Sequence, residues 1–87
     1  MKDEIVAVVQ DIVQGKHGPY AVATSDSHPD INFTFSLEKL VWNEEKLPSK
    51  GTYVVLSDIQ RKKAGWRAES ARLYTLEDEK SSKELST

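Results

Sequence analysis

INFTFSL, residues 31–37, is the stretch that decides the fold. Three apolar residues, Ile31, Phe33 and Phe35, alternate here with three polar ones. A period of two is that of a β-strand with one face buried and the other in water. The sequence therefore predicts a half-buried strand in the middle of the chain, and the segments on either side predict the sheet to which it belongs.

Strand composition recurs on both sides of this stretch. Four further segments are rich in β-branched or aromatic residues and are bounded by Gly, Pro, Ser or Asp, which is typical of strands and turns. They are EIVAVVQDIV (4–13), YAVATSD (20–26), GTYVVLSDIQ (51–60) and WRAESARLY (66–74). Apolar residues occur on both faces of the 51–60 segment, so we expect it to be buried on both sides. GKHGP (15–19), SDSHPD (25–30) and RKKAG (61–65) are the expected turns.

SLEKLVWNEEKLP, residues 36–48, interrupts the strand pattern. Leu37, Leu40 and Val41 fall at helical spacing behind Ser36, a good N-cap residue, and Pro48 prevents continuation. These features predict one short helix or 3₁₀ turn between the third and fourth strands. Five strands with a single helical turn in this place predict an all-β fold, a small closed barrel that leaves no exposed sheet edge.

Size and composition allow one small domain. The chain has 87 residues, 38% of them hydrophobic, and no cysteine, so no disulfide or thiolate metal site can form. No apolar run approaches the roughly 20 residues that span a bilayer, and MKDEI at the N-terminus lacks the apolar segment of a signal peptide. We expect a cytoplasmic monomer without membrane contact, with one domain over residues 1–75 and a polar, flexible tail over 76–87.

Four stretches of the chain resemble the cold-shock domain, a five-stranded OB-fold barrel. HGPYAV (17–22) stands at the place of the family's KGFGFI, and INFTFS (31–36) at the place of VFVHFS. LPSKGTYVVL (47–56) matches the entry into the fourth strand, and AGWRAESARLY (64–74) matches the final strand. The likeness covers roughly residues 4–74, and it implies an OB-fold-like, cold-shock-like barrel.

The resemblance also implies a site, although most of its aromatic residues are missing. Cold-shock domains bind single strands by stacking bases on outward aromatic side chains of the first three strands. The most direct alignment puts Pro19 and Ala21 outward in the second strand, and Asn32 and Thr34 in the third. Of the family's rings only Phe35 remains, and it can equally belong to the core. A register slip of one residue would turn Tyr20 outward.

RKKAGWRAESARLY, residues 61–74, holds five of the twelve basic residues in a chain of net charge −2. One interpretation is a charged hairpin turn that keeps a sheet soluble. The other is a phosphate-binding surface with Trp66 as a stacking ring. His17 stands where the family has lysine, and when protonated it could contact phosphate. The predicted nucleic-acid-binding residues are Arg61, Lys62, Lys63, Trp66, Arg67, Phe35, Tyr20 and His17.

Trp42 has two interpretations as well. It can plug one end of the barrel with its indole N–H on a carbonyl, or it can lie exposed and form a second aromatic face with Trp66. The two histidines, His17 and His28, lie on different loops, so we expect no metal site and no cofactor. No nucleophile, phosphate-loop or zinc-protease motif is present, and we expect no enzymatic activity.

Two functional hypotheses follow. The first is a small non-enzymatic module that binds single-stranded RNA or DNA weakly through the OB-fold surface and the 61–67 turn. The second is a barrel that has lost nucleic-acid binding and uses the Trp66/Arg67 ribbon to contact a protein partner, since Trp and Arg are enriched at binding hot spots.

Overall fold

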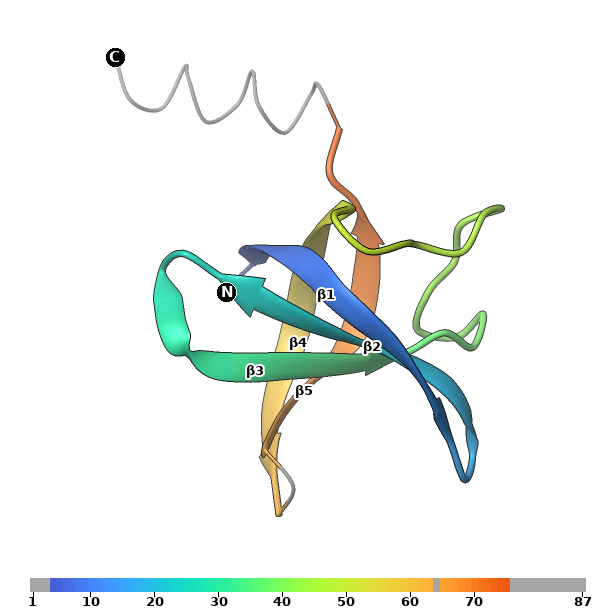
Figure 1. Cartoon of the computed structure of the whole chain (residues 1–87), viewed down its shortest axis with the longest axis horizontal. Coiled ribbons are helices and arrows are strands. Elements are labelled where there is room, and N and C mark those ends of the chain that lie inside the picture. Colours follow the sequence, from blue (N-terminus) through green and yellow to red (C-terminus); the bar gives the residue numbers. More distant parts are fainter. Residues whose placement is uncertain (1–3, 64, 76–87) are drawn as a thin grey trace.

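The computed structural model describes residues 4–63 and 65–75 of the chain. Five strands make up its regular structure: β1 (Ile5–Gly15), β2 (Gly18–Ser25), β3 (His28–Ser36), β4 (Tyr53–Lys62) and β5 (Gly65–Leu73). They form one sheet that closes on itself in the order β1-β2-β3-β5-β4 (Figure 1). The predicted all-β fold with five strands is confirmed. The predicted tail, residues 76–87, lies outside the described residues.

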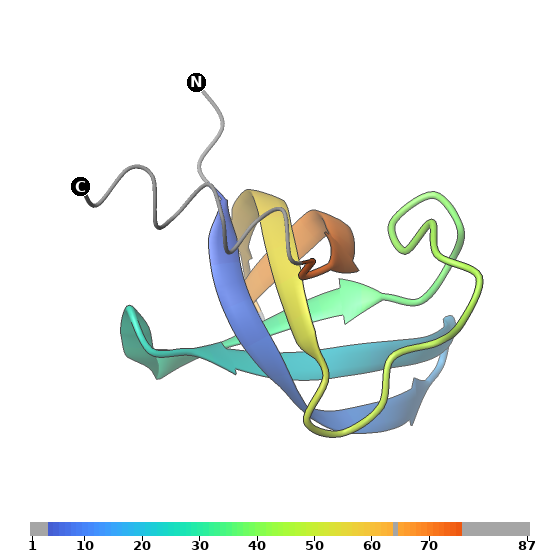
Figure 2. The same ribbon diagram turned by 90° about the horizontal axis from the view of Figure 1, so that it is seen from above.

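Strand pairing is mixed. Consecutive strands β1–β2, β2–β3 and β4–β5 pair antiparallel, and β1 pairs antiparallel with β4 to close the ring. The exception is β3, which runs parallel to β5 over two pairs, Phe33 with Trp66 and Thr34 with Arg67. Figure 2 shows how the strands wrap around a common interior.

Two hairpin turns are tighter than predicted. Gly15 pairs with Gly18, which has a φ of 110°, so the β1–β2 turn contains only Lys16 and His17. Lys62 pairs with Gly65, so most of the predicted RKKAG turn belongs to the strands. This register decides which way each basic side chain points.

Of the prediction of one short helix or 3₁₀ turn between β3 and β4, the helix is wrong, because no helix forms in the described part of the chain. One hydrogen-bonded turn is present: Ser36 Oγ accepts from Glu38 N at 3.1 Å, and Glu38 O accepts from Val41 N at 3.0 Å and from Trp42 N at 2.7 Å. The turn ends because Val41 O accepts from Ala71 N of β5, so this carbonyl is no longer available to a further helical turn.

Leu40, which the helical pattern placed on a buried face, is 94% exposed. Its apolar side chain belonged to the spacing that predicted the helix. Helical spacing places residues on one buried face only if a helix forms. Because this segment is a loop that crosses to β5, the spacing of Leu37, Leu40 and Val41 does not predict which of them are buried.

The core consists of alanine, branched aliphatic and aromatic side chains that face the interior. Trp42 is 1% exposed, stacks on Phe35 with ring centroids 5.8 Å apart, and donates its indole N–H to Lys46 O at 2.9 Å. The interpretation of Trp42 as a plug with its N–H on a carbonyl is therefore confirmed. Val54, Val55 and Leu56 are all buried, as expected for β4, whereas Tyr53 at its start is 60% exposed.

None of the described residues belongs to a helix long and apolar enough to cross a lipid bilayer.

Candidate nucleic-acid interface

The outer face of β2 and β3 is set by their register. Ala21 pairs with Phe35, and both are completely buried. Because successive side chains alternate, Tyr20 and its partner Ser36 point outward. Strand β2 therefore has the slipped register in which Tyr20, rather than Ala21, faces out.

Phe35 is consequently not a surface ring. It is 0% exposed and lies in the core against Trp42, so it cannot stack on a base, and its assignment to the interface is corrected. Thr34, by contrast, lies on the outer face beside Arg67 of β5, as the alignment implied.

The basic hairpin distributes its charges over two faces. Arg61 pairs with Trp66, and its guanidinium carbon lies 5.7 Å from the centre of the indole. The neighbouring pair, one residue further from the turn, is Gln60 with Arg67. Because successive side chains of a strand alternate, Arg67 points to the opposite side of the sheet from Trp66. Trp66 packs against the core and does not stand beside Arg67. The predicted surface with Trp66 flanked by all four cations is therefore split.

Two adjoining grooves cover the outer face. The first, called the Lys62 groove, has a volume of about 590 Å³ and is lined by Tyr20, Thr34, Lys62, Lys63, Gly65 and Arg67. The second, called the Glu38 groove, has a volume of about 270 Å³ and is lined by Gly15, Lys16, His17, Gly18, Pro19, Tyr20, Ser36, Glu38 and Arg67. Tyr20 and Arg67 line both, so they join the two grooves.

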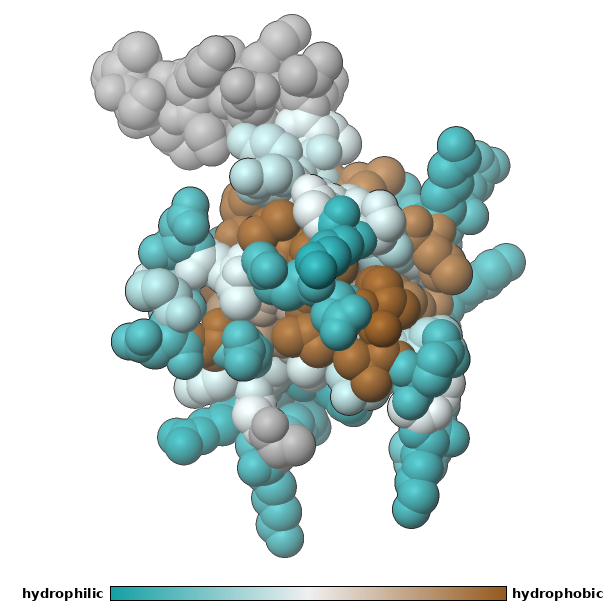
Figure 3. Space-filling view, viewed as in Figure 1, coloured by the Kyte–Doolittle hydropathy of each residue, from teal (hydrophilic) through white to brown (hydrophobic). Residues whose placement is uncertain are grey.

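The closed sheet brings the two hairpin turns to the same side of the molecule. In Figure 1 the β1–β2 and β4–β5 hairpins both project from the lower edge. Hydrophilic side chains extend from this edge in Figure 3. Lys16 and His17 come from one turn, and Lys62 and Lys63 from the other, although some 45 residues separate them in the sequence.

The Tyr20 ring is held over Gly15 of β1. A Cβ atom on Gly15 would lie 3.0 Å from Tyr20 Cε1 and 3.1 Å from Cδ1. These contacts are tighter than most Cβ atoms make, so a side chain at position 15 would require the Tyr20 ring to shift slightly. The ring is half-buried, so part of its surface is open to a ligand.

Residues 4–63 and 65–75 provide no ion-pair partner for the cations of the two grooves. Lys16, His17, Lys62, Lys63 and Arg67 form no ion pair with another described residue, whereas Arg72 pairs with Glu4 at 3.7 Å outside the two grooves. A positive surface can therefore persist on a chain of net charge −2.

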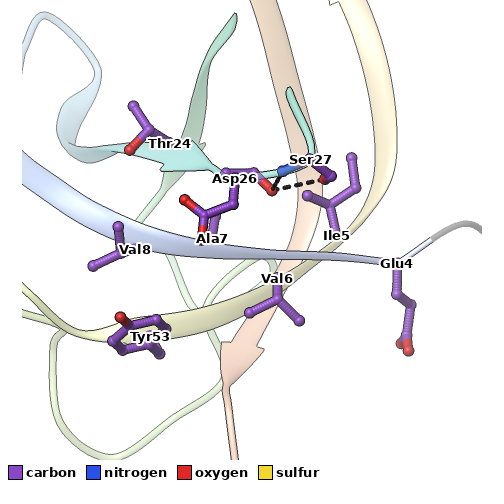
Figure 4. Close-up of a pocket in the computed structure, with 10 residues that line it drawn as sticks. Glu4, Ile5, Val6, Ala7, Val8, Thr24, Asp26, Ser27 and Tyr53 are labelled. Carbon is purple, nitrogen blue, oxygen red and sulfur yellow. Dashed lines mark hydrogen bonds between the residues drawn. The ribbon is translucent and has the colours of Figure 1, made fainter. Parts of the chain in front are cut away.

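A further hollow lies between β1, the β2–β3 turn and Tyr53 (Figure 4). Its volume is about 360 Å³, and its polar lining includes the carboxylates of Glu4 and Asp26. None of the predicted site residues lines it. The hollow is lined by none of the cations of the two grooves.

The grooves also contain residues that sequence reasoning did not assign. Lys16 precedes His17 in the β1–β2 turn. Because His17 was predicted to contact phosphate, the basic residue beside it could have been predicted as well. Glu38 and Ser36 gave no such signal, because they were assigned to a helix start, and only the path of the loop brings them beside Tyr20.

The described residues contain no cluster of three or more His, Cys, Asp or Glu side chains that could hold a metal ion. The chain matches no protein-family model, no curated protein and no solved structure.

Proposed function

We propose that the chain is a small, non-enzymatic, OB-fold-like module of the cold-shock type that binds single-stranded RNA or DNA weakly across the Lys62 and Glu38 grooves. The strand order β1-β2-β3-β5-β4 with a parallel β3–β5 pair supports the OB-fold assignment. OB-folds bind oligonucleotides on the face of strands 2 and 3, between the loops that follow strands 1 and 4. The observation that carries the proposal is the position of Tyr20 and Arg67 between two basic turns.

Each part of the surface has a physical role in this proposal. Lys62, Lys63 and Arg67 contact backbone phosphates, and the release of counterions supplies most of the affinity. One base stacks on the Tyr20 ring, a contact that contributes about 1–3 kcal/mol. A single ring gives a weak complex, and we expect dissociation constants of roughly 10⁻⁴ to 10⁻⁶ M, the range of non-specific binding.

An NMR titration tests the proposal. The ¹⁵N-labelled chain is titrated at low salt with single-stranded RNA and DNA oligomers of mixed sequence. We expect the largest amide shifts in β2, in β3 and in the two hairpin turns, and small shifts around Glu4 and Asp26. Absence of any shift at low salt, or shifts confined to the face of the acidic hollow, would contradict it.

A protein partner is the second candidate, and Trp66 is the observation that favours it. The indole ring lines a hollow of about 490 Å³ together with Ile31, Phe33 and Ile59. The guanidinium of Arg61 lies over one face of the indole. A half-buried Trp with an Arg beside it is typical of binding hot spots.

The two candidate functions use opposite faces of the β4–β5 hairpin, so variants on each face can distinguish them. A protein that purifies with the chain is expected to be lost with Arg61→Ala and kept with Lys63→Ala. A co-purifying protein that responds in the reverse way, or to neither change, would exclude the Trp66 hollow as its contact.

A further inference from the structure

A carboxylate lines one of the two basic grooves. Glu38 lines the Glu38 groove together with Tyr20, His17 and Arg67, and it forms no ion pair with any described residue. Negative charge at this position weakens the attraction of phosphate. Glu38 is exposed, and its carboxylate gives this groove an acceptor that a phosphate cannot use but an N–H donor can.

The backbone holds Glu38 in place. Its N–H donates to Ser36 Oγ at 3.1 Å, and its carbonyl accepts hydrogen bonds from Val41 N and Trp42 N. The preceding residue, Leu37, donates its N–H to Pro19 O at 3.2 Å and so ties the start of the loop to β2. The side chain of Glu38 therefore extends from a fixed point next to the Tyr20 ring.

A nucleobase that stacks on Tyr20 presents its edge to the rest of this groove. A carboxylate is an acceptor with two oxygens, and it pairs best with two adjacent N–H donors. Guanine has such a pair on its Watson–Crick edge, N1–H and the N2 amino group. In adenine and cytosine the amino group stands next to an acceptor nitrogen, and in uracil the one N–H lies between two carbonyls. Glu38 therefore favours guanine over the other three bases.

We infer that the Glu38 groove is a guanine subsite, an inference that rests on the proposed function. Guanine stacks on Tyr20, its N1–H and N2 amino group donate to the carboxylate of Glu38, and Arg67 holds the neighbouring phosphate in the Lys62 groove. The Lys62 groove adjoins this subsite through Tyr20 and Arg67, which line both grooves.

Uridine hexamers with one central substitution test the subsite. Fluorescence anisotropy gives the affinity of the wild-type chain for hexamers with guanosine, inosine, adenosine or 7-deazaguanosine at the third position. We expect guanosine to bind about tenfold more tightly than inosine, which lacks the N2 amino group, or adenosine, as for a bidentate base contact. 7-Deazaguanosine keeps both donors and is expected to equal guanosine.

Glu38→Gln is the matching protein variant, because it keeps the size of the side chain and replaces one carboxylate oxygen by an amide donor. We expect the guanosine preference to fall to less than twofold, with unchanged or slightly higher affinity for the unsubstituted uridine hexamer. Glu45→Gln makes the same change of charge on an exposed residue of the same loop outside both grooves, and it is expected to leave the preference intact.

The outcomes separate this inference from the proposed function. Equal affinity for all hexamers, or a preference that survives Glu38→Gln, would overturn the guanine subsite and leave nucleic-acid binding in place. A loss of affinity for 7-deazaguanosine would overturn it as well, since it would show that the base is read at N7 instead. No binding of any hexamer at low salt would overturn both.

Discussion

At the scale of the residue, Tyr20 carries most of the proposed site. It is the one aromatic side chain that lines the two grooves, and Gly15 beneath it leaves the space that the ring occupies. The sequence left its direction open, because a slip of one residue reverses every side chain of a strand. The burial of Ala21 opposite Phe35 resolves this ambiguity.

We predict that Tyr20→Ala weakens the binding of a mixed-sequence oligonucleotide about tenfold, because one stacking contact is lost. Tyr20→Phe keeps the ring and is expected to retain the affinity within about twofold. Fluorescence anisotropy at constant salt measures both. Tyr53→Ala is the control, since Tyr53 is 60% exposed and lies outside the two grooves. An equal loss in the Tyr20 and Tyr53 variants would remove Tyr20 from the site.

Asp58 has an unusual backbone conformation in β4. Its φ is 52°, in the left-handed region that non-glycine residues rarely adopt. Leu56 and Ile59 both pack against the core although three positions separate them, so the irregular residue between them lets the strand change faces. Chemical denaturation of two variants measures the strain.

Asp58→Gly and Asp58→Ala both remove the carboxylate, so their difference isolates the conformation. We predict that the glycine variant is more stable by about 1 kcal/mol, because a Cβ atom disfavours positive φ and glycine does not. An alanine variant as stable as the glycine variant would show that the strand relaxes without cost.

At the scale of the element, the β4–β5 hairpin separates its arginines by the alternation of a strand. Arg61 faces Trp66 and the core side, whereas Arg67 faces Thr34 and both grooves. The sequence predicted one basic patch, because the composition of a stretch does not show which way each side chain points. The pairing of Lys62 with Gly65 moved Arg61 and Lys62 into the strand, where their directions become opposite.

We predict that Arg67→Ala lowers oligonucleotide affinity about tenfold, since a charge-assisted contact contributes about 1.5–3 kcal/mol. Arg61→Ala, which removes the same charge from the other face of the same hairpin, is expected to change the affinity less than twofold. Isothermal titration calorimetry at moderate salt compares the two. Similar losses from both would mean that overall charge, and not the face, governs binding.

The 37–52 loop shows a different competition. Its apolar spacing and the Ser36 cap favour a helix, and the cap forms. The β-bridge between Trp42 and Ala71 then ends the segment after a single hydrogen-bonded turn. Burying the indole against Phe35 stabilises the fold more than one further helical turn would, because a single turn in water is marginal.

At the scale of the whole molecule, closure of the sheet gathers charges that lie far apart in the chain. The ring places the β1–β2 and β4–β5 turns on the same side, while Glu4 and Asp26 line a separate hollow. The net charge of −2 is therefore a poor guide to the local field.

Salt dependence tests this picture for the molecule as a whole. With Lys62→Ala and Lys63→Ala combined, we predict that the slope of log K against log salt falls by about 1.4, or about 0.7 for each phosphate contact on a single strand. The control Lys46→Ala with Lys50→Ala removes the same charge from the 37–52 loop, outside both grooves, and is expected to change the slope by much less. Equal slopes in the two double variants would contradict specific contacts at the β4–β5 turn.

The sequence by itself determined the strands and most of the core. The period of two in residues 31–36 is a local property, and it predicts a strand with one buried face wherever the strand lies in the sheet. For Trp42 the sequence allowed two positions, and the structure has the buried one, in which the large ring is out of water and its N–H is bonded to a carbonyl.

Only the tertiary structure decided which residues share a surface. Phe35 lies inward and Trp66 packs on the core side, whereas Tyr20, Arg67 and Glu38 meet although they come from β2, β5 and a loop. Cross-strand register and ring closure are long-range pairings, and a one-residue change in either reverses a side chain without changing its local pattern. For that physical reason, the strands could be predicted from the sequence, whereas the grooves between them could not.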